Sequence, residues 1–236
     1  MAMGKVGNDA NGDGLRQPGE GALAGVTVNL LDPQNNVVAS TVRADDGSYS
    51  FDVSPGATHR VAFVKPSGFG AFSPQDVGSD DAVDSDADSY GRTALFTVAG
   101  AETSYVVVLD AGILPPAGTG TVSGQAWNDW SGDGIQQAGE DGVAGVFVDL
   151  INTQTGQIRT VLTNRDGEYL FYGVQPGNYT LVFRPVGLDA VFTGKDLGGD
   201  DTIDSDVGAN GTTDVFALLA GGLKSYLDAG MLIQAP

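Results

Sequence analysis

The chain has 236 residues, 41% of them hydrophobic, and its 30 Asp and Glu against 11 Lys and Arg give a net charge of −19. Such an acidic chain repels nucleic acid and anionic lipid, so we expect neither nucleic-acid binding nor membrane insertion. The absence of cysteine excludes disulfides and thiol chemistry. The first residues, Met1 to Met3, lack the basic and apolar regions of a signal peptide, and we expect the chain to be a fragment of a larger protein.

An internal repeat organises the chain, because residues 4–114 align with residues 124–232 along nearly their whole length. The clearest matches are NDANGDGLRQPGE with NDWSGDGIQQAGE, LAGVTVNLLD with VAGVFVDLIN, DDGSYSF with RDGEYLF, and LDAGIL with LDAGML. We therefore predict two domains, 4–114 and 121–234. The segment between them, PPAGTG at 115–120, is predicted to be a short and fairly stiff Pro/Gly linker.

The local pattern in each repeat predicts strands. Apolar and polar residues alternate over 26–30 and 146–150, as in a strand with one buried face, and no window of useful length has helical spacing. Asp-Gly pairs at 46–47 and 166–167 predict hairpin turns, each followed by two aromatic residues on one face of the next strand. Later strands are predicted at 61–64, 93–98, 104–109, 179–183, 213–218 and 223–227. Roughly seven short strands per repeat predict an all-β protein of two tandem β-sandwiches.

Residues 9–20 match the twelve-residue calcium loop of an EF-hand. Side-chain oxygens stand at positions 1, 3 and 5, a glycine at position 6 permits the sharp turn, and a glutamate closes the loop at position 12. Residues 129–140 repeat the pattern, which makes a chance match by an Asp- and Gly-rich surface turn the weaker interpretation. The predicted Ca²⁺ ligands are Asp9, Asn11, Asp13, Leu15 and Glu20 in the first copy, and Asp129, Ser131, Asp133, Ile135 and Glu140 in the second.

The flanking structure distinguishes these loops from calcium sensors. A sensor works by moving two helices apart when calcium binds, whereas strands are predicted on both sides of these loops. We therefore expect calcium that locks a domain and not calcium that switches it.

A second acidic feature lies late in each repeat, within 76–88 and within 196–206. Aspartates at this density are unfavourable unless they are well solvated or share cations. We expect cation binding, with a solvated loop that keeps the surface soluble as the alternative. The predicted ligands are Asp80, Asp81, Asp84 and Asp86 in the first copy and Asp200, Asp201, Asp204 and Asp206 in the second. Asp110 and Asp228, in the LDAG motifs, could equally be ligands or turn residues.

The sequence gives little support to catalysis. His59 is the one histidine, and Thr180 takes its place in the second repeat, so no chemistry common to both repeats can use it. No nucleophile elbow, phosphate-binding loop or candidate zinc triad is present. Trp127 and Trp130 flank the second calcium loop only, and they are either packing residues or an exposed platform for a sugar or peptide.

With these motifs in view, each repeat resembles the B-type domains of serine-aspartate repeat (Sdr) surface adhesins, the SdrD B-like family within the Cna B-type sandwiches. The motifs that carry the resemblance are N-D-x-[NS]-G-D-G-[LI]-x-x-x-G-E, A-G-V-x-V-x-L, D-G-x-Y-x-F, P-G, D-S-D and D-A-G. The resemblance implies Ig-like sandwiches with more than one calcium ion each, forming a rod that holds a ligand-binding region away from the cell wall. The family pattern has an aromatic residue just before N-D, which Trp127 supplies and Gly7 does not.

The predicted function is a non-enzymatic, calcium-binding module that acts as a rigid stalk or spacer in a bacterial cell-surface or secreted adhesin. We expect a monomer whose partners are calcium ions and, through the parent protein, a host or matrix protein or carbohydrate. The alternative is an accessory module that recognises carbohydrate or protein within a larger secreted protein or enzyme. Its contacts would be Trp127, Trp130 or the loops around Phe69 and Phe72.

Overall fold

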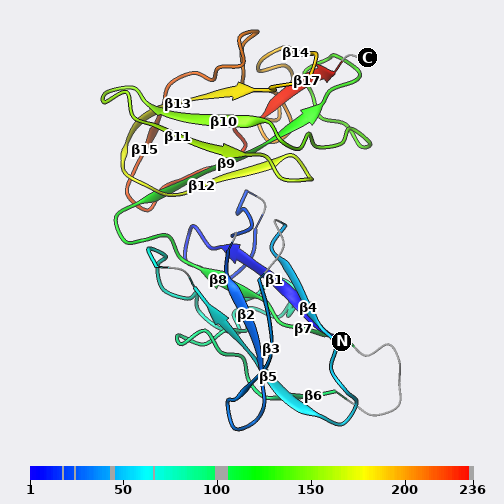
Figure 1. The fold of residues 1–236 in the computed structure, drawn as a ribbon. Helices are drawn as coiled ribbons and strands as arrows, with labels where there is room; N and C mark the ends of the chain where they lie inside the picture. Colours follow the sequence, from blue (N-terminus) through cyan, green and yellow to red (C-terminus); the bar gives the residue numbers. More distant parts are fainter. Residues whose placement is uncertain (18, 24, 43–45, 66, 99–105, 234–236) are drawn as a thin grey trace. The chain divides into compact units, whose positions relative to one another are not determined.

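The computed structural model describes residues 1–17, 19–23, 25–42, 46–65, 67–98 and 106–233. The chain divides into two compact units, Met1–Ala117 and Gly118–Pro236, called unit 1 and unit 2 below (Figure 1). Every regular element in the described residues is a strand, which confirms the predicted all-β fold with two tandem domains. The described part of the chain contains no helix that could cross a membrane.

Unit 1 contains two four-stranded sheets. In the first sheet β1 is central: it pairs antiparallel with β4 and parallel with β7 and β8. The second sheet has the order β3-β2-β5-β6, with antiparallel neighbours. The strands are β1 (Ala2–Asn8), β2 (Thr27–Leu31), β3 (Val37–Val42), β4 (Ser48–Phe51), β5 (Thr58–Val64), β6 (Phe96–Thr97), β7 (Val107–Val108) and β8 (Ala111–Ile113).

Unit 2 repeats this plan. Its first sheet has the order β12-β9-β17-β14 with β16 also paired to β9, and its second sheet has the order β11-β10-β13-β15. The first and last strands of the unit, β9 and β17, are parallel neighbours, as β1 and β8 are in unit 1. The strands are β9 (Gly120–Asn128), β10 (Phe147–Asn152), β11 (Ile158–Leu162), β12 (Glu168–Val174), β13 (Gly177–Arg184), β14 (Ala190–Phe192), β15 (Phe216–Leu218), β16 (Leu223–Lys224) and β17 (Ala229–Ile233).

The late strands are shorter than predicted. Of the stretch 93–98 only Phe96–Thr97 is a strand, and of 223–227 only Leu223–Lys224. The predicted strand at 104–109 lies partly outside the described residues, and within them only Val107–Val108 forms a strand. The other described residues of these stretches lie outside the strands.

The predicted aromatic pairs lie in the cores. Tyr169 and Phe171 on β12 are both buried, and the Tyr169 ring meets Phe183 of β13 edge to face at a centroid distance of 5.5 Å. Tyr49 and Phe63 repeat this contact in unit 1 at 5.6 Å. Since such edge-to-face pairs add to the free energy of area burial, they fix how the two sheets of each unit pack together.

Two glycines let the chain pass close over the central strands. A Cβ atom built on Gly124 of β9 would lie 2.4 Å from the carbonyl oxygen of Leu227, and one on Gly4 of β1 would lie 1.9 Å from that of Leu109. The same two carbonyls accept hydrogen bonds from Tyr169 Oη at 2.6 Å and Tyr49 Oη at 2.5 Å. The close approach fixes the following residues, Asp228 and Asp110, beside the central strands.

Replacing Phe171 by Ala should lower the free energy of unfolding of unit 2 by about 3–5 kcal/mol, because a fully buried ring is lost and its cavity can only partly collapse. Both tryptophans of the chain lie in unit 2, so urea titration followed by tryptophan fluorescence reports on this unit. The exposed β12 position Glu168→Ala is the control, and an equal loss for both variants would contradict the assigned core.

Candidate metal centres

In the first EF-like loop the ligand side chains turn toward the loop's own backbone. Asp9 accepts hydrogen bonds from the Gly12 and Gly14 amides, at 2.6 Å to Oδ1 and 2.9 Å to Oδ2. Gly14, at loop position 6, has φ +84°, and a Cβ there would also lie 2.6 Å from the carbonyl oxygen of Pro74. Only glycine fits this position, for both reasons.

The rest of the first loop closes on Glu20. Its Oε1 accepts the Ala10 amide at 2.8 Å and its Oε2 accepts the Gln17 amide at 3.0 Å. The side chain of Asn11 accepts the Asp13 amide at 3.0 Å, and Asp13 in turn accepts the Leu15 amide at 2.9 Å. The structure therefore brings the predicted residues of this loop together into one compact turn.

The second loop has the same geometry. Asp129 accepts the Gly132 and Gly134 amides, each at 2.7 Å, and Asp133 accepts the Ile135 amide at 3.0 Å. Glu140 accepts the amides of Ser131 at 3.2 Å and Gln137 at 3.0 Å. The Ser131 hydroxyl donates to Asp129 at 3.0 Å.

The carboxylates that open and close both loops are buried. The exposed fractions are 2% for Asp9, 8% for Glu20, 0% for Asp129 and 5% for Glu140. None of these four forms a salt bridge to another described residue. Buried carboxylates without a cationic partner are costly, and their position in a loop of oxygen ligands favours a bound cation as that partner.

Each EF-like loop pairs with the acidic segment of its own unit. In unit 1 Leu15 forms a β-bridge with Asp84, and the Arg16 amide donates to the Val83 carbonyl at 2.7 Å. In unit 2 Ile135 bridges Asp204 in the same way. A small cavity in unit 1 is lined by Asp9 of the loop, by Asp84 of the acidic segment and by Asp110. The two acidic features that are far apart in the sequence thus form one centre.

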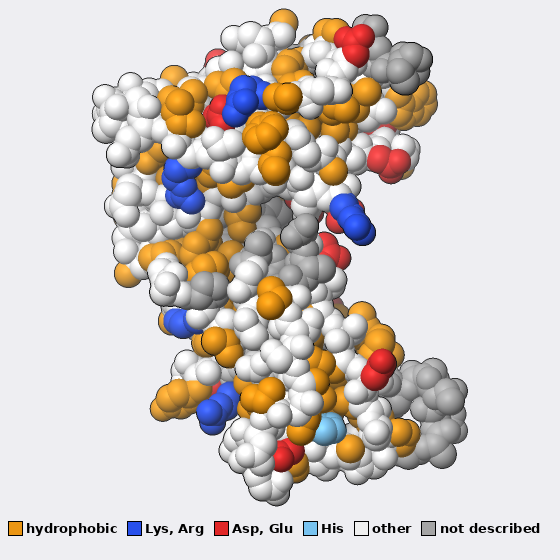
Figure 2. All heavy atoms as spheres, viewed as in Figure 1, with side chains coloured by type: hydrophobic (Ala, Val, Ile, Leu, Met, Phe, Trp, Pro, Cys, Tyr) orange, Lys and Arg blue, Asp and Glu red, His pale blue; other side chains and the backbone are white. Residues whose placement is uncertain are grey.

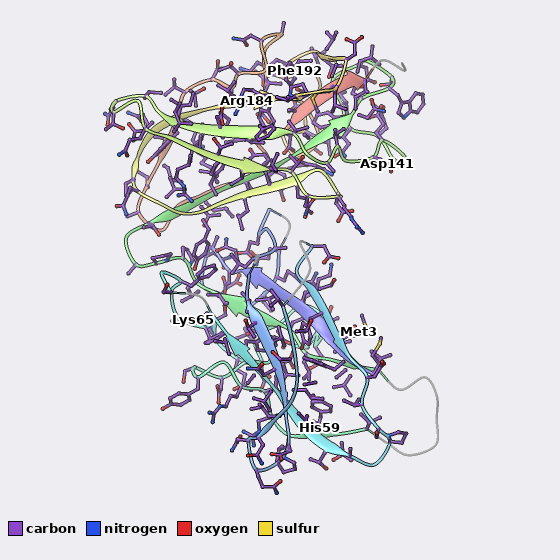
Figure 3. All side chains as sticks on the ribbon, in the orientation of Figure 1. Met3, His59, Lys65, Asp141, Arg184 and Phe192 are labelled. Atoms are coloured by element: carbon purple, nitrogen blue, oxygen red, sulfur yellow. The ribbon has the colours of Figure 1, made fainter. Side chains whose placement is uncertain are left out.

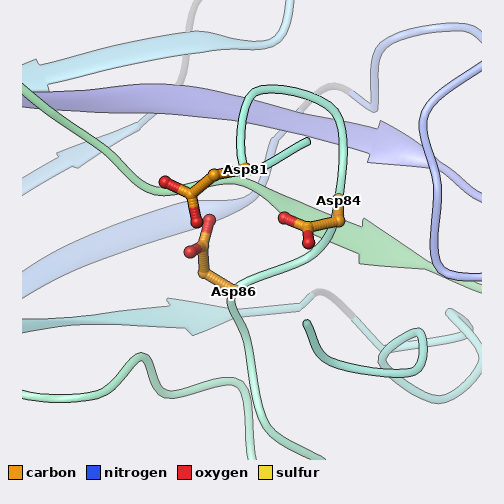
Figure 4. Close-up of side chains that lie close together, drawn as sticks. All are labelled: Asp81, Asp84 and Asp86. Carbon is orange, nitrogen blue, oxygen red and sulfur yellow. The ribbon is translucent and has the colours of Figure 1, made fainter. Parts of the chain in front are cut away.

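Within the acidic segments three carboxylates converge in each unit. Ligand oxygens of Asp81, Asp84 and Asp86 lie within 4.8 Å of one another (Figure 4), and so do those of Asp196, Asp204 and Asp206. Either group could hold a metal ion. The Oδ1 atoms of Asp84 and Asp204 are buried and have no hydrogen-bond partner, so both are available as metal ligands. The donor set, all oxygen, suits calcium.

The structure separates some predicted ligands from these groups and adds another. Asp80 and Asp200 stand outside them, and each accepts a backbone amide two residues ahead, from Ala82 and Thr202, at 3.1 Å. Asp201 is also outside the group of unit 2. Asp196, which the sequence argument did not select, belongs to that group. The sequence does carry a signal for it, because the motif D-[VL]-G at 76–78 is repeated at 196–198. In the structure Asp196 has a left-handed backbone with φ 51°.

Asp110 and Asp228 lie behind the acidic groups. Asp228 Oδ1 accepts the Gln125 amide of β9 at 2.6 Å, while its own amide donates to Asp206 at 2.6 Å. Asp110 makes the same two bonds with Lys5 and Asp86, and its Oδ2 lies 3.6 Å from Arg16 Nη2. Both carboxylates therefore fasten the acidic group to the central strand, whether or not they also contact an ion.

Burial is the largest cause, and repulsion from neighbouring carboxylates a smaller one, of raised pKa values among these aspartates. It raises the pKa of Asp86 and Asp206 to about 7 and that of Asp228 to about 8, although backbone amides partly oppose the shift. The pKa values of Asp84 and Asp204 are also raised, first by burial and then by repulsion from aspartates of the same segment. A bound cation would reverse this balance by stabilising the charged forms.

The aromatic residues of the alternative function fall into two classes. Trp127 is 1% exposed and Phe72 is 9% exposed, so neither can serve as a contact platform. Trp130, at position 2 of the second loop, is 65% exposed. His59 on β5 (Figure 3) packs at a tilt against Phe96 of β6, with 6.3 Å between the ring centroids.

Two sandwiches of this topology, each with an EF-like loop at the end of its first strand, define a tandem β-sandwich module. The model of the SdrD B-like domain matches residues 3–113 and 120–231, and the chain belongs to this family. The resemblance seen in the sequence is thereby confirmed. Membership of the family supports an extracellular or cell-surface location, and the family is a domain class and not an enzyme class.

Two staphylococcal relatives match most of the chain. Serine-aspartate repeat-containing protein D of Staphylococcus aureus (strain Newman) is 33% identical over 211 residues, which cover 88% of this chain and 15% of that protein. Serine-aspartate repeat-containing protein F of Staphylococcus epidermidis is 33% identical over 207 residues, covering 86% and 11%. The chain thus spans only about a seventh of the length of the first of these relatives.

Among solved structures, a streptococcal ancillary pilin matches with a TM-score of 0.32 and 10% identity, covering 97% of this chain and 61% of the pilin. The shaft pilin SpaA of Lactobacillus rhamnosus GG, as a double mutant, matches with a TM-score of 0.31 and 10% identity, covering 100% and 98%. Scores this low carry no argument, and the family assignment depends on the sequence match.

In the absence of metal, the protein should become more stable as the pH falls from about 8 to about 5. Asp86, Asp206 and Asp228 have folded pKa values of about 7 to 8, whereas an unfolded aspartate titrates near 3.9. The folded state therefore binds more protons between these values, and the resulting stabilisation is lost as the pH rises through 7 to 8. Thermal melts in excess chelator at several pH values measure this. A midpoint that rises with pH in that window would contradict the assignment.

Proposed function

We propose that the chain is a non-enzymatic spacer segment whose two sandwiches are stabilised and stiffened by calcium. The observation that carries the proposal is the unpartnered, buried Oδ1 of Asp84 and of Asp204, each inside a converging group of three carboxylates. The ligands proposed are those of the two EF-like loops together with Asp81, Asp84 and Asp86 in unit 1 and Asp196, Asp204 and Asp206 in unit 2.

Calcium would act by linkage and by charge compensation. An ion that binds the folded loop and not the unfolded chain stabilises each site by RT ln(1+[L]/Kd), about 2.7 kcal/mol at a hundredfold excess over Kd. One ion at each loop and each acidic group would also bring the net charge from −19 to about −11. Because each EF-like loop is bridged to its acidic segment, binding at one feature rigidifies the backbone that carries the other.

A stalk role follows from the tandem arrangement and from the family. The two sandwiches follow each other in the sequence through the Pro- and Gly-containing residues 115–119, and no catalytic cleft is seen in the described part of either unit. The parent protein would use such segments to hold a separate ligand-binding region away from the cell wall. Within this proposal the protein is monomeric in dilute solution, and contact with a host or matrix partner is made elsewhere in the parent.

A recognition role retains in its favour the exposed indole of Trp130 and the half-buried ring of Phe69. Trp127 and Phe72 are buried, so they cannot contact a ligand. These two aromatic residues provide a small contact surface, and the spacer function accounts for more of the molecule.

Calcium should raise the melting temperature of both units, and excess EGTA should lower it. At a few mM calcium we expect the free energy of unfolding to rise by at least about 2–3 kcal/mol per unit. The same concentration of magnesium should stabilise the protein little, because Mg²⁺ prefers a rigid octahedral site. Glu140→Gln should abolish most of the calcium-induced rise in the melting temperature of unit 2, which tryptophan fluorescence measures. The melting temperature of unit 1, measured by calorimetry, should not change. The exposed Glu168→Gln is the matched control. An EGTA-independent midpoint for the unaltered protein would refute the proposal.

Asp206→Asn should have effects of opposite sign with and without calcium. In chelator it removes one of the repelling buried carboxylates, so the midpoint of unit 2 should rise by about 4 °C for each kcal/mol gained. In calcium it removes a ligand, so the shift produced by the ion should shrink. Asp214→Asn, an exposed carboxylate that pairs with Lys195, is the control. A loss of stability in both conditions would show that Asp206 is a structural residue only.

A further inference from the structure

Strand β3 forms an unprotected edge of unit 1. It is the first strand in the order β3-β2-β5-β6, and among the described residues it pairs only with β2. Its sequence, VVASTV, has no charge and no proline. Val37, Val38 and Val42 are 58%, 51% and 62% exposed. Figure 2 shows uncharged and hydrophobic side chains over the region of β2 and β3. An edge of this kind presents unpaired backbone donors and acceptors to any other strand.

Unit 2 offers a matched edge that is protected. Strand β11 holds the same place in its sheet, and Arg159 stands opposite Leu150 as Ala39 stands opposite Leu30. Arg159 Nη2 donates to the Tyr172 carbonyl of β12 at 2.9 Å, and its guanidinium lies 5.8 Å from the Phe171 ring centroid. The arginine thus ties the edge strand to the other sheet with an inward charge. The described part of unit 1 has no such side-chain bond from β3 to β4.

We propose that β3 is a self-association edge, at which two copies of this chain pair antiparallel and join their four-stranded sheets into one. A two-fold axis perpendicular to the sheet at Ser40 places Ser40 opposite itself and Val38 opposite Val42 of the second copy. Residues an even number apart point to the same face of a strand, so this register keeps the outer faces of both sheets on one side.

A second copy suits this edge because it brings an identical uncharged strand. Val42 lies beside Thr27, which in turn lies beside Val64, so pairing also extends an apolar row on the outer face. The net charge of −19 on each copy opposes association, but β3 contributes none of it. Repulsion between charges farther away is screened within about 8–10 Å at physiological salt. Pairing should therefore strengthen with salt, and a single strand pair gives a weak contact seen only when chains are crowded.

Sedimentation equilibrium of the calcium-loaded protein tests the proposal. From about 10 µM to about 1 mM we expect a change from monomer to dimer, with more dimer at high salt. Ala39→Arg, which copies the arginine of β11, should lower the dimer fraction at the highest concentration at least about fivefold. Ser54→Arg adds the same charge at an exposed turn of unit 1 and should leave association unchanged.

A cysteine trap identifies the strand. Opposed residues of an antiparallel pair have Cα atoms about 4.5–5.5 Å apart, within the range of a disulfide. Ser40→Cys should therefore give a disulfide-linked dimer on mild oxidation, and the equivalent Thr160→Cys on β11 should not. A monomer at 1 mM in high salt, association that survives Ala39→Arg, or equal cross-linking of both cysteine variants would each overturn the proposal. Binding of a foreign strand peptide by a protein that stays monomeric would also overturn it.

Discussion

Buried carboxylates beside the central strand are the constraint on which the rest of each unit depends. Asp228 accepts the Gln125 amide and Asp206 accepts the Asp228 amide, each at 2.6 Å, and burial raises the pKa of both. A fold can keep such groups only if protons or cations compensate them. The neighbouring EF-like loop contributes Asp129 and Glu140, also buried, so the need for compensation extends over the whole end of the unit.

The glycines of the central strands make this arrangement possible. Because Gly4 and Gly124 have no side chain, the segment before the last strand can cross β1 and β9 at van der Waals distance. That crossing delivers Asp110 and Asp228 to the strand amides, and through them the acidic segment to the EF-like loop. The stability of the sandwich and the geometry of the candidate metal centre therefore have a common origin in backbone packing.

The two units share their buried centre but differ on their surfaces. On the outer face of the second sheet, unit 2 pairs Arg184 with Asp149 at 2.7 Å and places the guanidinium 5.1 Å from the Phe147 ring centroid. The corresponding register in unit 1 has Val64, Asn29 and Thr27. Asp149 is 9% exposed, so a buried charge in unit 2 has an uncharged counterpart, Asn29, in unit 1. The repeat is therefore strict at the acidic segments and relaxed on this face of the second sheet.

The sequence by itself determined the all-β class, the duplication and the EF-like loops, because period-two alternation, a repeated motif and fixed ligand spacing are local properties. It did not identify β1 and β9 as central strands, because the neighbours of a strand in a sheet come from distant parts of the chain. It selected Asp80 and Asp200 and passed over Asp196, because only the tertiary structure decides which carboxylates of an acidic segment converge. The pairing of that segment with the EF-like loop, and the contrast between Ala39 and Arg159 at the sheet edges, depend on contacts between distant parts of the chain, which no local pattern encodes.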